Sequence, residues 1–126
     1  MSKVVELTKE NFEQVIKDND AVIVDFWAPW CGPCRAFAPT FEAVAEETEG
    51  VVFAKVNTQD QPELGATFGI RSIPTLMAFR EEIIVFQQAG ALPRGPFTEL
   101  VGKVKELDME EVRAQVAEHQ AQHGPN

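Results

Sequence analysis

Positive charge is scarce in this sequence. Its 126 residues include 11 Lys and Arg against 20 Asp and Glu, which gives a formal net charge of -9 at pH 7. The few basic residues are scattered singly along the chain, whereas proteins that bind nucleic acid or anionic lipid gather them into patches. The sequence therefore predicts neither nucleic acid nor a membrane surface among the partners.

Long apolar runs are missing as well. No stretch approaches the roughly 20 apolar residues that a membrane-spanning helix needs. Residues 1–20 alternate polar and apolar positions without the apolar centre of a signal peptide. These features predict a cytoplasmic protein, and its length and 44% hydrophobic content suit one packed globular core.

Cysteine occurs only twice, at Cys31 and Cys34. A disulfide that closes so short a loop removes little entropy from the unfolded chain, so a purely structural bridge is not favoured. In a reducing cytosol this spacing is more typical of redox chemistry. His119 and His123 formally add a second pair of zinc ligands, but zinc fingers separate their pairs by about 12 to 15 residues. Most of the chain intervenes here, so no metal is predicted.

The apolar periodicity predicts an alternation of strands and helices, and hence an α/β sandwich. A first helix is predicted from an N-cap at Thr8 to Lys17. Further helices are predicted over 34–47, over 62–68 and from near Pro96, and strands over 21–27, 51–57, 75–80 and 83–88.

The cysteines follow the strand 21–27, which is apolar on both faces except at Asp25 and is therefore expected at the middle of the sheet. Active sites of open α/β sheets lie at such strand ends. Cys31 opens the following helix, whose N-terminus stabilises an anion, so Cys31 is predicted to be the attacking thiolate. Cys34 would then resolve the mixed disulfide.

Helical residues three apart are about 5 to 6 Å apart, too far for a disulfide. Cys31 is therefore expected partly outside the helix, in a geometry that Gly32 and Pro33 can set. Asp25 is the candidate base for Cys34, because a carboxyl group in an apolar strand has a raised pKa. The alternative is a structural Asp25 paired with Lys55 of the neighbouring strand, and the two interpretations are compatible.

The segment from Asp25 to Cys34, Asp-Phe-Trp-Ala-Pro-Trp-Cys-Gly-Pro-Cys, resembles the active-site segment of the thioredoxin family. The similarity continues through Pro39, Lys55 and Phe68-Gly-Ile-Arg-Ser-Ile-Pro-Thr75 to Gly90-Ala91, and covers about residues 3 to 107. It implies the thioredoxin fold, a three-layer α/β/α sandwich with a central mixed β-sheet, and protein disulfide reductase activity.

The resemblance also implies the roles of further residues and partners. Cys31 would be the nucleophile, Cys34 the resolving thiol, Asp25 the buried acid/base and Lys55 its neighbour, while Pro74 would follow a cis peptide bond. The implied docking surface for target proteins comprises Trp30, Gly32, Pro33, Ile73, Pro74, Gly90 and Ala91. A flavin-dependent thioredoxin reductase would supply electrons from NADPH, so no cofactor is expected to be bound, and Gly-Pro between the cysteines is typical of reductants.

Two features depart from the family pattern. Glu81-Glu82 stands where the last hairpin normally has an Asn-Gly turn, and because Glu adopts positive φ poorly we predict a longer or distorted turn. Residues 108–126 extend beyond the domain predicted over 1–107. Asp108 can cap a separate helix with Glu111 at its third position, or the preceding helix can continue unbroken; the cap favours a break.

The apolar face of this extension is thin, with mainly Val112 and Val116, so it is predicted to be a solvated, partly frayed helix; a helix for self-association or for binding a partner is the alternative. A binding module without redox turnover is a rival function for the whole domain, and the intact cysteine pair argues against it.

Overall fold

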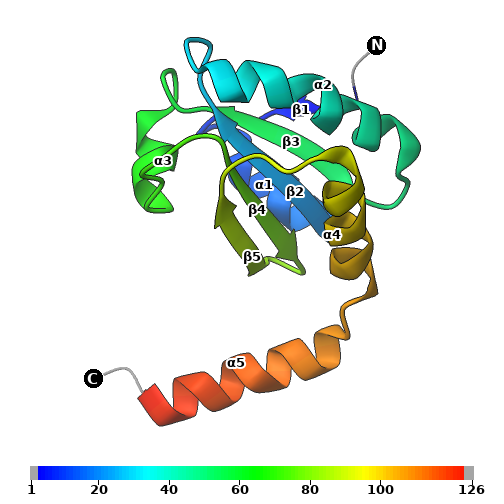
Figure 1. The fold of residues 1–126 in the computed structure, drawn as a ribbon. Coiled ribbons are helices and arrows are strands. Elements are labelled where there is room, and N and C mark those ends of the chain that lie inside the picture. Colours follow the sequence, from blue (N-terminus) through cyan, green and yellow to red (C-terminus); the bar gives the residue numbers. More distant parts are fainter. Residues whose placement is uncertain (1–2, 124–126) are drawn as a thin grey trace.

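The computed structural model describes residues 3–123, which form ten helices and strands (Figure 1). The strands are β1 (Val5–Glu6), β2 (Ala21–Trp27), β3 (Val52–Asn57), β4 (Thr75–Arg80) and β5 (Ile83–Ala89). The helices are α1 (Phe12–Asp18), α2 (Gly32–Glu47), α3 (Pro62–Thr67), α4 (Arg94–Glu106) and α5 (Met109–His123).

One mixed sheet in the order β1-β3-β2-β4-β5 forms the middle layer. β1 and β2 run parallel to β3, whereas β4 runs antiparallel to β2 and to β5. Side chains of α2 and α4 pack on one face of the sheet, and those of α1 and α3 pack on the other. The predicted three-layer α/β/α sandwich is therefore confirmed, with β2 at its centre.

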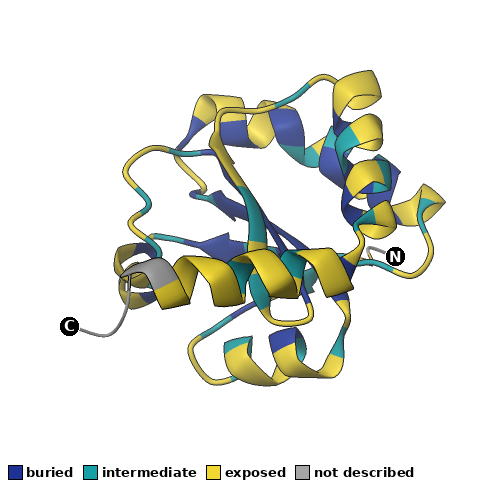
Figure 2. Ribbon diagram, turned by 90° about the horizontal axis from the view of Figure 1, so that it is seen from below, coloured by how far each residue is buried: buried dark blue, intermediate teal, exposed yellow. Residues whose placement is uncertain are grey.

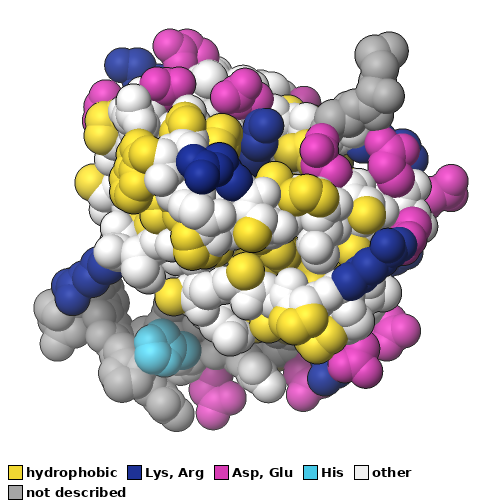
Figure 3. Space-filling model, turned by 45° about the horizontal axis from the view of Figure 1, so that its top comes forward, with side chains coloured by type: hydrophobic (Ala, Val, Ile, Leu, Met, Phe, Trp, Pro, Cys, Tyr) yellow, Lys and Arg dark blue, Asp and Glu magenta, His cyan; other side chains and the backbone are white. Residues whose placement is uncertain are grey.

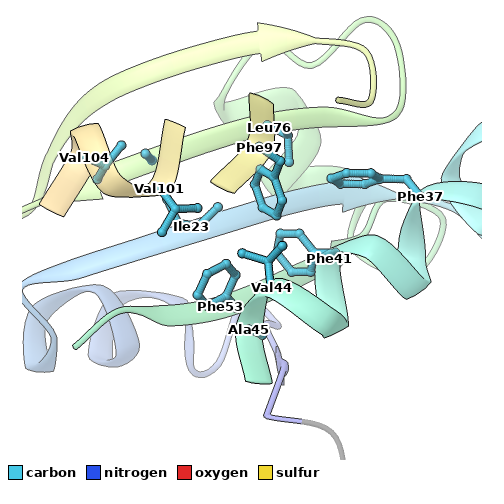
Figure 4. Close-up of a cluster of buried hydrophobic side chains, with 11 residues drawn as sticks. Ile23, Phe37, Phe41, Val44, Ala45, Phe53, Leu76, Phe97, Val101 and Val104 are labelled. Atoms are coloured by element: carbon cyan, nitrogen blue, oxygen red, sulfur yellow. The ribbon is translucent and has the colours of Figure 1, made fainter. Parts of the chain in front are cut away.

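The face under α2 and α4 has an aromatic core (Figure 4). Phe41 of α2 stacks on Phe97 of α4, with 5.6 Å between ring centroids and 20° between ring planes. Phe53 of β3 meets Phe41 edge-on, and Phe37 meets Phe97 in the same way. These contacts fix α2 against the sheet, and with it the position of the cysteines at the start of α2.

Some predicted boundaries were wrong. α2 begins at Gly32, two residues before the predicted start, and α1 begins at Phe12 with Asn11 as its N-cap. Thr8 instead begins a turn, in which its own N–H donates to Asn11 Oδ1. The two-residue strand β1 was not predicted, because it is too short to show a periodicity.

The predicted distortion of the last turn was also wrong. Arg80 and Ile83 are register partners, so Glu81 and Glu82 alone form the hairpin loop, and both have positive φ, at 50° and 69°. The register shifts within the hairpin instead, opposite Ala78 and Phe79. The antiparallel pairing thus holds both glutamates in a conformation that tight hairpin turns require and that L-residues disfavour.

The positive φ of Glu82 can be tested by substitution. Glu82→Gly is expected to stabilise the protein by about 1 kcal/mol, because glycine adopts positive φ without a Cβ clash. Urea unfolding would measure the change, with Glu82→Ala as the matched control that removes the same carboxylate but keeps the Cβ. Equal stability of the two variants would contradict the strain at this position.

Arg80 joins this hairpin to the end of α4. Its buried guanidinium donates hydrogen bonds to the carbonyl oxygens of Val104 (2.7 Å) and Lys105 (3.2 Å), and it pairs with Asp20 at 3.2 Å. The carbonyl oxygens at a helix C-terminus have no partners within the helix, so a cation there satisfies them.

α5 is a separate helix, as the Asp108 cap predicts. Asp108 Oδ1 accepts hydrogen bonds from the N–H groups of Glu110 and Glu111, and α4 ends before it. Met109 is buried, which the sequence analysis missed, and Arg113 pairs with Glu81 of the hairpin. Most of α5 beyond these contacts is exposed (Figure 2).

No helix within residues 3–123 is both long and apolar enough to cross a bilayer.

Candidate active site

Cys31 and Cys34 are joined by a disulfide at the N-terminus of α2. Cys31 is the N-cap residue, with extended backbone dihedrals of φ -87° and ψ 113°, and its Cα lies 5.2 Å from that of Cys34. The expectation that Cys31 lies partly outside the helix is therefore confirmed. Gly32 and Pro33 form the first helical positions and are exposed.

The helix N-terminus faces the Cys31 sulfur directly. The N–H of Cys34 donates to Cys31 Sγ at 3.2 Å, so the sulfur takes the place that a side-chain oxygen has in an ordinary N-cap. This donor and the helix dipole favour the negatively charged form of Cys31 once the disulfide is reduced. Cys34 is 1% exposed and Cys31 5% exposed, so only the edge of Cys31 is open to an incoming disulfide.

The loop before β4 covers the disulfide from the side. Cys31 Sγ lies 3.8 Å from the carbonyl oxygen of Ile73, and the Ile73–Pro74 peptide bond is cis, as the resemblance implies. Gly90 donates its N–H to the carbonyl oxygen of Pro74 at 2.8 Å and has φ 101°, which only glycine adopts readily. Ala91, next in the chain, is exposed.

Asp25 lies in β2 and is 4% exposed. Burial raises the pKa of its carboxyl group from 3.8 to about 7, although the positive charge of Lys55 acts in the opposite direction. Its buried oxygen Oδ1 has no hydrogen-bond partner among the described residues. The prediction of a raised pKa is therefore confirmed, with the value close to neutral pH.

Lys55 is the β3 register partner of Asp25, but no ion pair joins the two side chains in the described part of the chain. Lys55 Nζ instead lies 5.1 Å from the centroid of the Trp27 ring, a cation–π distance. The structural alternative of a direct Asp25–Lys55 pair is thus absent, and the interaction between them is a longer-range one.

Asp25 and Cys34 face a common cavity of about 360 Å³. The cavity is lined by Val4, Asp25, Trp27, Cys34, Arg35, Ala38, Pro39, Phe41, Glu42 and Lys55. The carboxyl group of Asp25 and the sulfur of Cys34 thus border the same hollow of the protein.

Hydrophobic side chains gather on the face that comes forward when the top of Figure 1, with the loop between β2 and α2, is turned toward the viewer (Figure 3). Trp30 is 67% exposed, the most exposed large hydrophobic side chain in the described residues. Trp30 and Ile73 line one groove of about 400 Å³, together with Thr58, Pro62, Gly65, Ala66, Ile70, Arg71 and Ser72. Of the predicted docking residues, the structure brings these two together beside Cys31, whereas Pro74 is buried beneath the surface.

Two contributors to the site were missed by the sequence analysis. Thr58 donates from its N–H (2.8 Å) and its Oγ1 (3.0 Å) to the carbonyl oxygen of Trp27, which ties the end of β2 to the loop after β3. Ala28 is fully buried against the cysteines, and its carbonyl oxygen accepts from the N–H of Cys31. The Thr58–Trp27 contact spans 31 residues, so no local sequence pattern predicts it.

No group of three or more His, Cys, Asp or Glu that could hold a metal ion occurs in the part of the chain that the structure describes. The side chain of His123, one member of the zinc alternative, lies outside the described residues.

Comparison with known proteins gives consistent matches. The family model described as Thioredoxin matches residues 3–106. The chain is 56% identical over 124 residues to a "Putative thioredoxin 2" of Streptomyces coelicolor, covering 98% of this chain and 92% of that protein. It is 43% identical over 105 residues to "Thioredoxin 1" of Nostoc sp., covering 82% and 98%. A mutant thioredoxin from Halobacterium salinarum has a TM-score of 0.77 at 30% identity, covering 84% and 95%.

Proposed function

The chain belongs to the thioredoxin family of thiol-disulfide oxidoreductases, and from this premise we propose how its residues carry out the reduction of protein disulfides. The observation that carries the proposal is the Cys31–Cys34 disulfide at the N-terminus of α2, with Cys31 as the N-cap. The family uses this redox-active disulfide without a bound cofactor.

The first step is attack of the Cys31 thiolate on one sulfur of a target disulfide. The target S–S bond breaks, a mixed disulfide with Cys31 forms, and the other target sulfur leaves as a thiolate that takes up a proton. The backbone N–H of Cys34 and the helix dipole stabilise the attacking thiolate.

The second step releases the target. Asp25 accepts the proton of Cys34 through the shared cavity, and the Cys34 thiolate attacks Cys31 Sγ. The mixed disulfide breaks and the second target sulfur leaves as a thiolate. Two electrons have passed to the target, and the Cys31–Cys34 disulfide remains. A pKa of about 7 lets Asp25 take up and return this proton near neutral pH.

Regeneration of the dithiol needs an external reductant. We propose a thioredoxin reductase that uses NADPH, as the family resemblance implies, with Trp30, Gly32, Pro33, Ile73, Pro74, Gly90 and Ala91 as the surface that meets both the reductase and the targets. A cycle that must be re-reduced after each turnover suits a reducing compartment, so we place the protein in the cytoplasm.

Precipitation of insulin tests the function. Dithiothreitol reduces insulin slowly, and the protein at micromolar concentration is expected to shorten the lag before turbidity appears. With NADPH and a thioredoxin reductase in place of dithiothreitol, insulin reduction should consume NADPH. Unchanged lag times with dithiothreitol would contradict the reductase function, whereas failure with the reductase alone would contradict only the proposed electron donor.

We further propose that residues 1–107 form the redox domain and that 108–126 are an extension outside it. The family model ends at residue 106, and α5 lies at the end of the molecule opposite the β2–α2 loop (Figure 1). In the insulin assay, a chain ending at Leu107 is expected to keep its activity within about twofold. It should be less stable by roughly 2 kcal/mol, because the burial of Met109 is lost.

A further inference from the structure

The groove between Trp30 and α3 has an uneven charge. Of the nine residues that line it, only Arg71 is charged, and Thr58 and Ser72 add hydroxyl groups. Arg71 is exposed, and its guanidinium has no hydrogen bond or ion pair within residues 3–123. The groove therefore presents one positive charge, unpaired among the described residues, between apolar and hydroxyl-bearing side chains.

The acidic residues near the groove have partners of their own. Glu63 of α3 pairs with Lys9 at 3.6 Å, and Asp60 accepts a hydrogen bond from the Asn57 side-chain amide at 3.3 Å. Neither carboxylate lines the groove. The cavity on the other side of the disulfide differs, because Asp25 and Glu42 line it together with Arg35 and Lys55. The unbalanced charge is thus confined to the side of Trp30 and Ile73.

The position of the groove decides what enters it. Trp30 directly precedes Cys31, and the carbonyl oxygen of Ile73 lies 3.8 Å from Cys31 Sγ. A target whose disulfide meets Cys31 must lay the residues that flank its own cysteine across Trp30 and Ile73. The occupant of the groove is therefore the chain segment next to the attacked cysteine of the target.

We propose that Arg71 is a specificity-determining residue, because its charge makes this groove a binding site for target segments that carry a carboxylate close to their disulfide. The inference rests on the proposed disulfide reductase function and names a substrate class for it. The net charge of -9 does not oppose this preference. At physiological salt, charges more than about 8 Å away are largely screened, so the nearby guanidinium dominates over the distant acidic surface.

Three synthetic peptides test the proposal, each with one internal disulfide and with Glu, Gln or Lys next to the attacked cysteine. The pre-reduced protein is mixed with each peptide, samples are quenched with acid, and second-order rate constants are obtained by chromatography. At physiological ionic strength, where only charges close to the groove act, the Glu peptide is expected to react about threefold faster than the Gln peptide, and the Lys peptide more slowly than both. In about 1 M salt the three rates should converge.

Arg71→Glu is expected to reverse the order of the three peptides. Lys17→Glu is the matched control, since it makes the same change in net charge on an exposed side chain at the end of α1. The end of α1 leads into the start of β2, whereas the active site lies at the other end of β2. Lys17→Glu should keep the order Glu, Gln, Lys.

The same order of peptides in Arg71→Glu and in Lys17→Glu would overturn the role of Arg71 while leaving disulfide reduction intact. Equal rates for the three peptides with the unsubstituted protein at physiological ionic strength would also overturn it. Failure of the unsubstituted protein to reduce any peptide would instead overturn the proposed function, and the inference with it.

Discussion

Cys31→Ser is expected to lower the protein-dependent part of the rate of insulin reduction by on the order of 10³-fold or more. A serine hydroxyl is not ionised near neutral pH, so neither the helix N-terminus nor the N–H of Cys34 can supply an attacking anion there. The first step of the cycle is then lost, and the remaining rate is that of dithiothreitol alone. The turbidity lag should therefore return to its value without the protein.

Cys34→Ser is the matched control, because it removes one thiol and the same disulfide but leaves the attacking sulfur in place. It should still form the mixed disulfide with Cys31 and then fail to resolve it. A target joined covalently to the variant, visible as a combined band on a non-reducing gel, is the expected result. The same covalent product with Cys31→Ser would contradict the assignment of Cys31 as the nucleophile.

Asp25→Asn is expected to stabilise the protein above pH 7 and to leave its stability nearly unchanged at pH 4. In the unfolded chain the carboxyl group loses its proton near its ordinary pKa of 3.8, whereas in the folded protein it keeps the proton up to about pH 7. The folded state therefore binds more protons between these values, and stability falls as the pH rises through this window.

The size of this effect follows from the pKa shift. A shift from 3.8 to about 7 corresponds to about 4 kcal/mol at pH 8, where the folded state holds a buried, charged Asp25. Urea unfolding of both proteins between pH 4 and pH 8 gives the difference curve, from which the pH dependence of all other groups cancels. Asp18→Asn, the same substitution at an exposed position, is the matched control.

A difference in stability between Asp25→Asn and the unsubstituted protein that stays constant from pH 4 to pH 8 would contradict the raised pKa.

The role of Asp25 as a base leads to a separate prediction for the activity of Asp25→Asn. Without the carboxylate, resolution of the mixed disulfide should slow by about 100-fold, and the mixed disulfide should accumulate.

The sequence was enough to predict the chemistry, because the reacting groups lie close together in the chain. Cys31, Cys34 and Asp25 fall within ten residues that end one strand and begin a helix, and local rules for strand burial and helix termini apply to each of them. The position of Ile73 beside Cys31 came from the family resemblance alone, since 42 residues separate the two.

Long-range contacts account for what could not be predicted. Thr58 acts on Trp27 across 31 residues, and Lys55 of β3 lies over the Trp27 ring of the neighbouring strand β2. At the hairpin the prediction failed for a different reason, because it relied on a local preference that strand pairing overrides. Local preference disfavours positive φ at Glu81 and Glu82, but the pairing of β4 with β5 overrides it, and Arg113 of α5 then pairs with Glu81.

Trp27 and Trp30 are the two tryptophans of a chain that has no tyrosine. Trp27 lines the cavity next to Cys34, and Trp30 directly precedes Cys31. Because disulfides quench excited indole rings while thiols do so less, both emitters sit beside the one bond that changes during turnover. Tryptophan fluorescence excited in the indole absorption band should therefore report the oxidation state of the protein. The measurement needs no added dye and has little background from the rest of the fold.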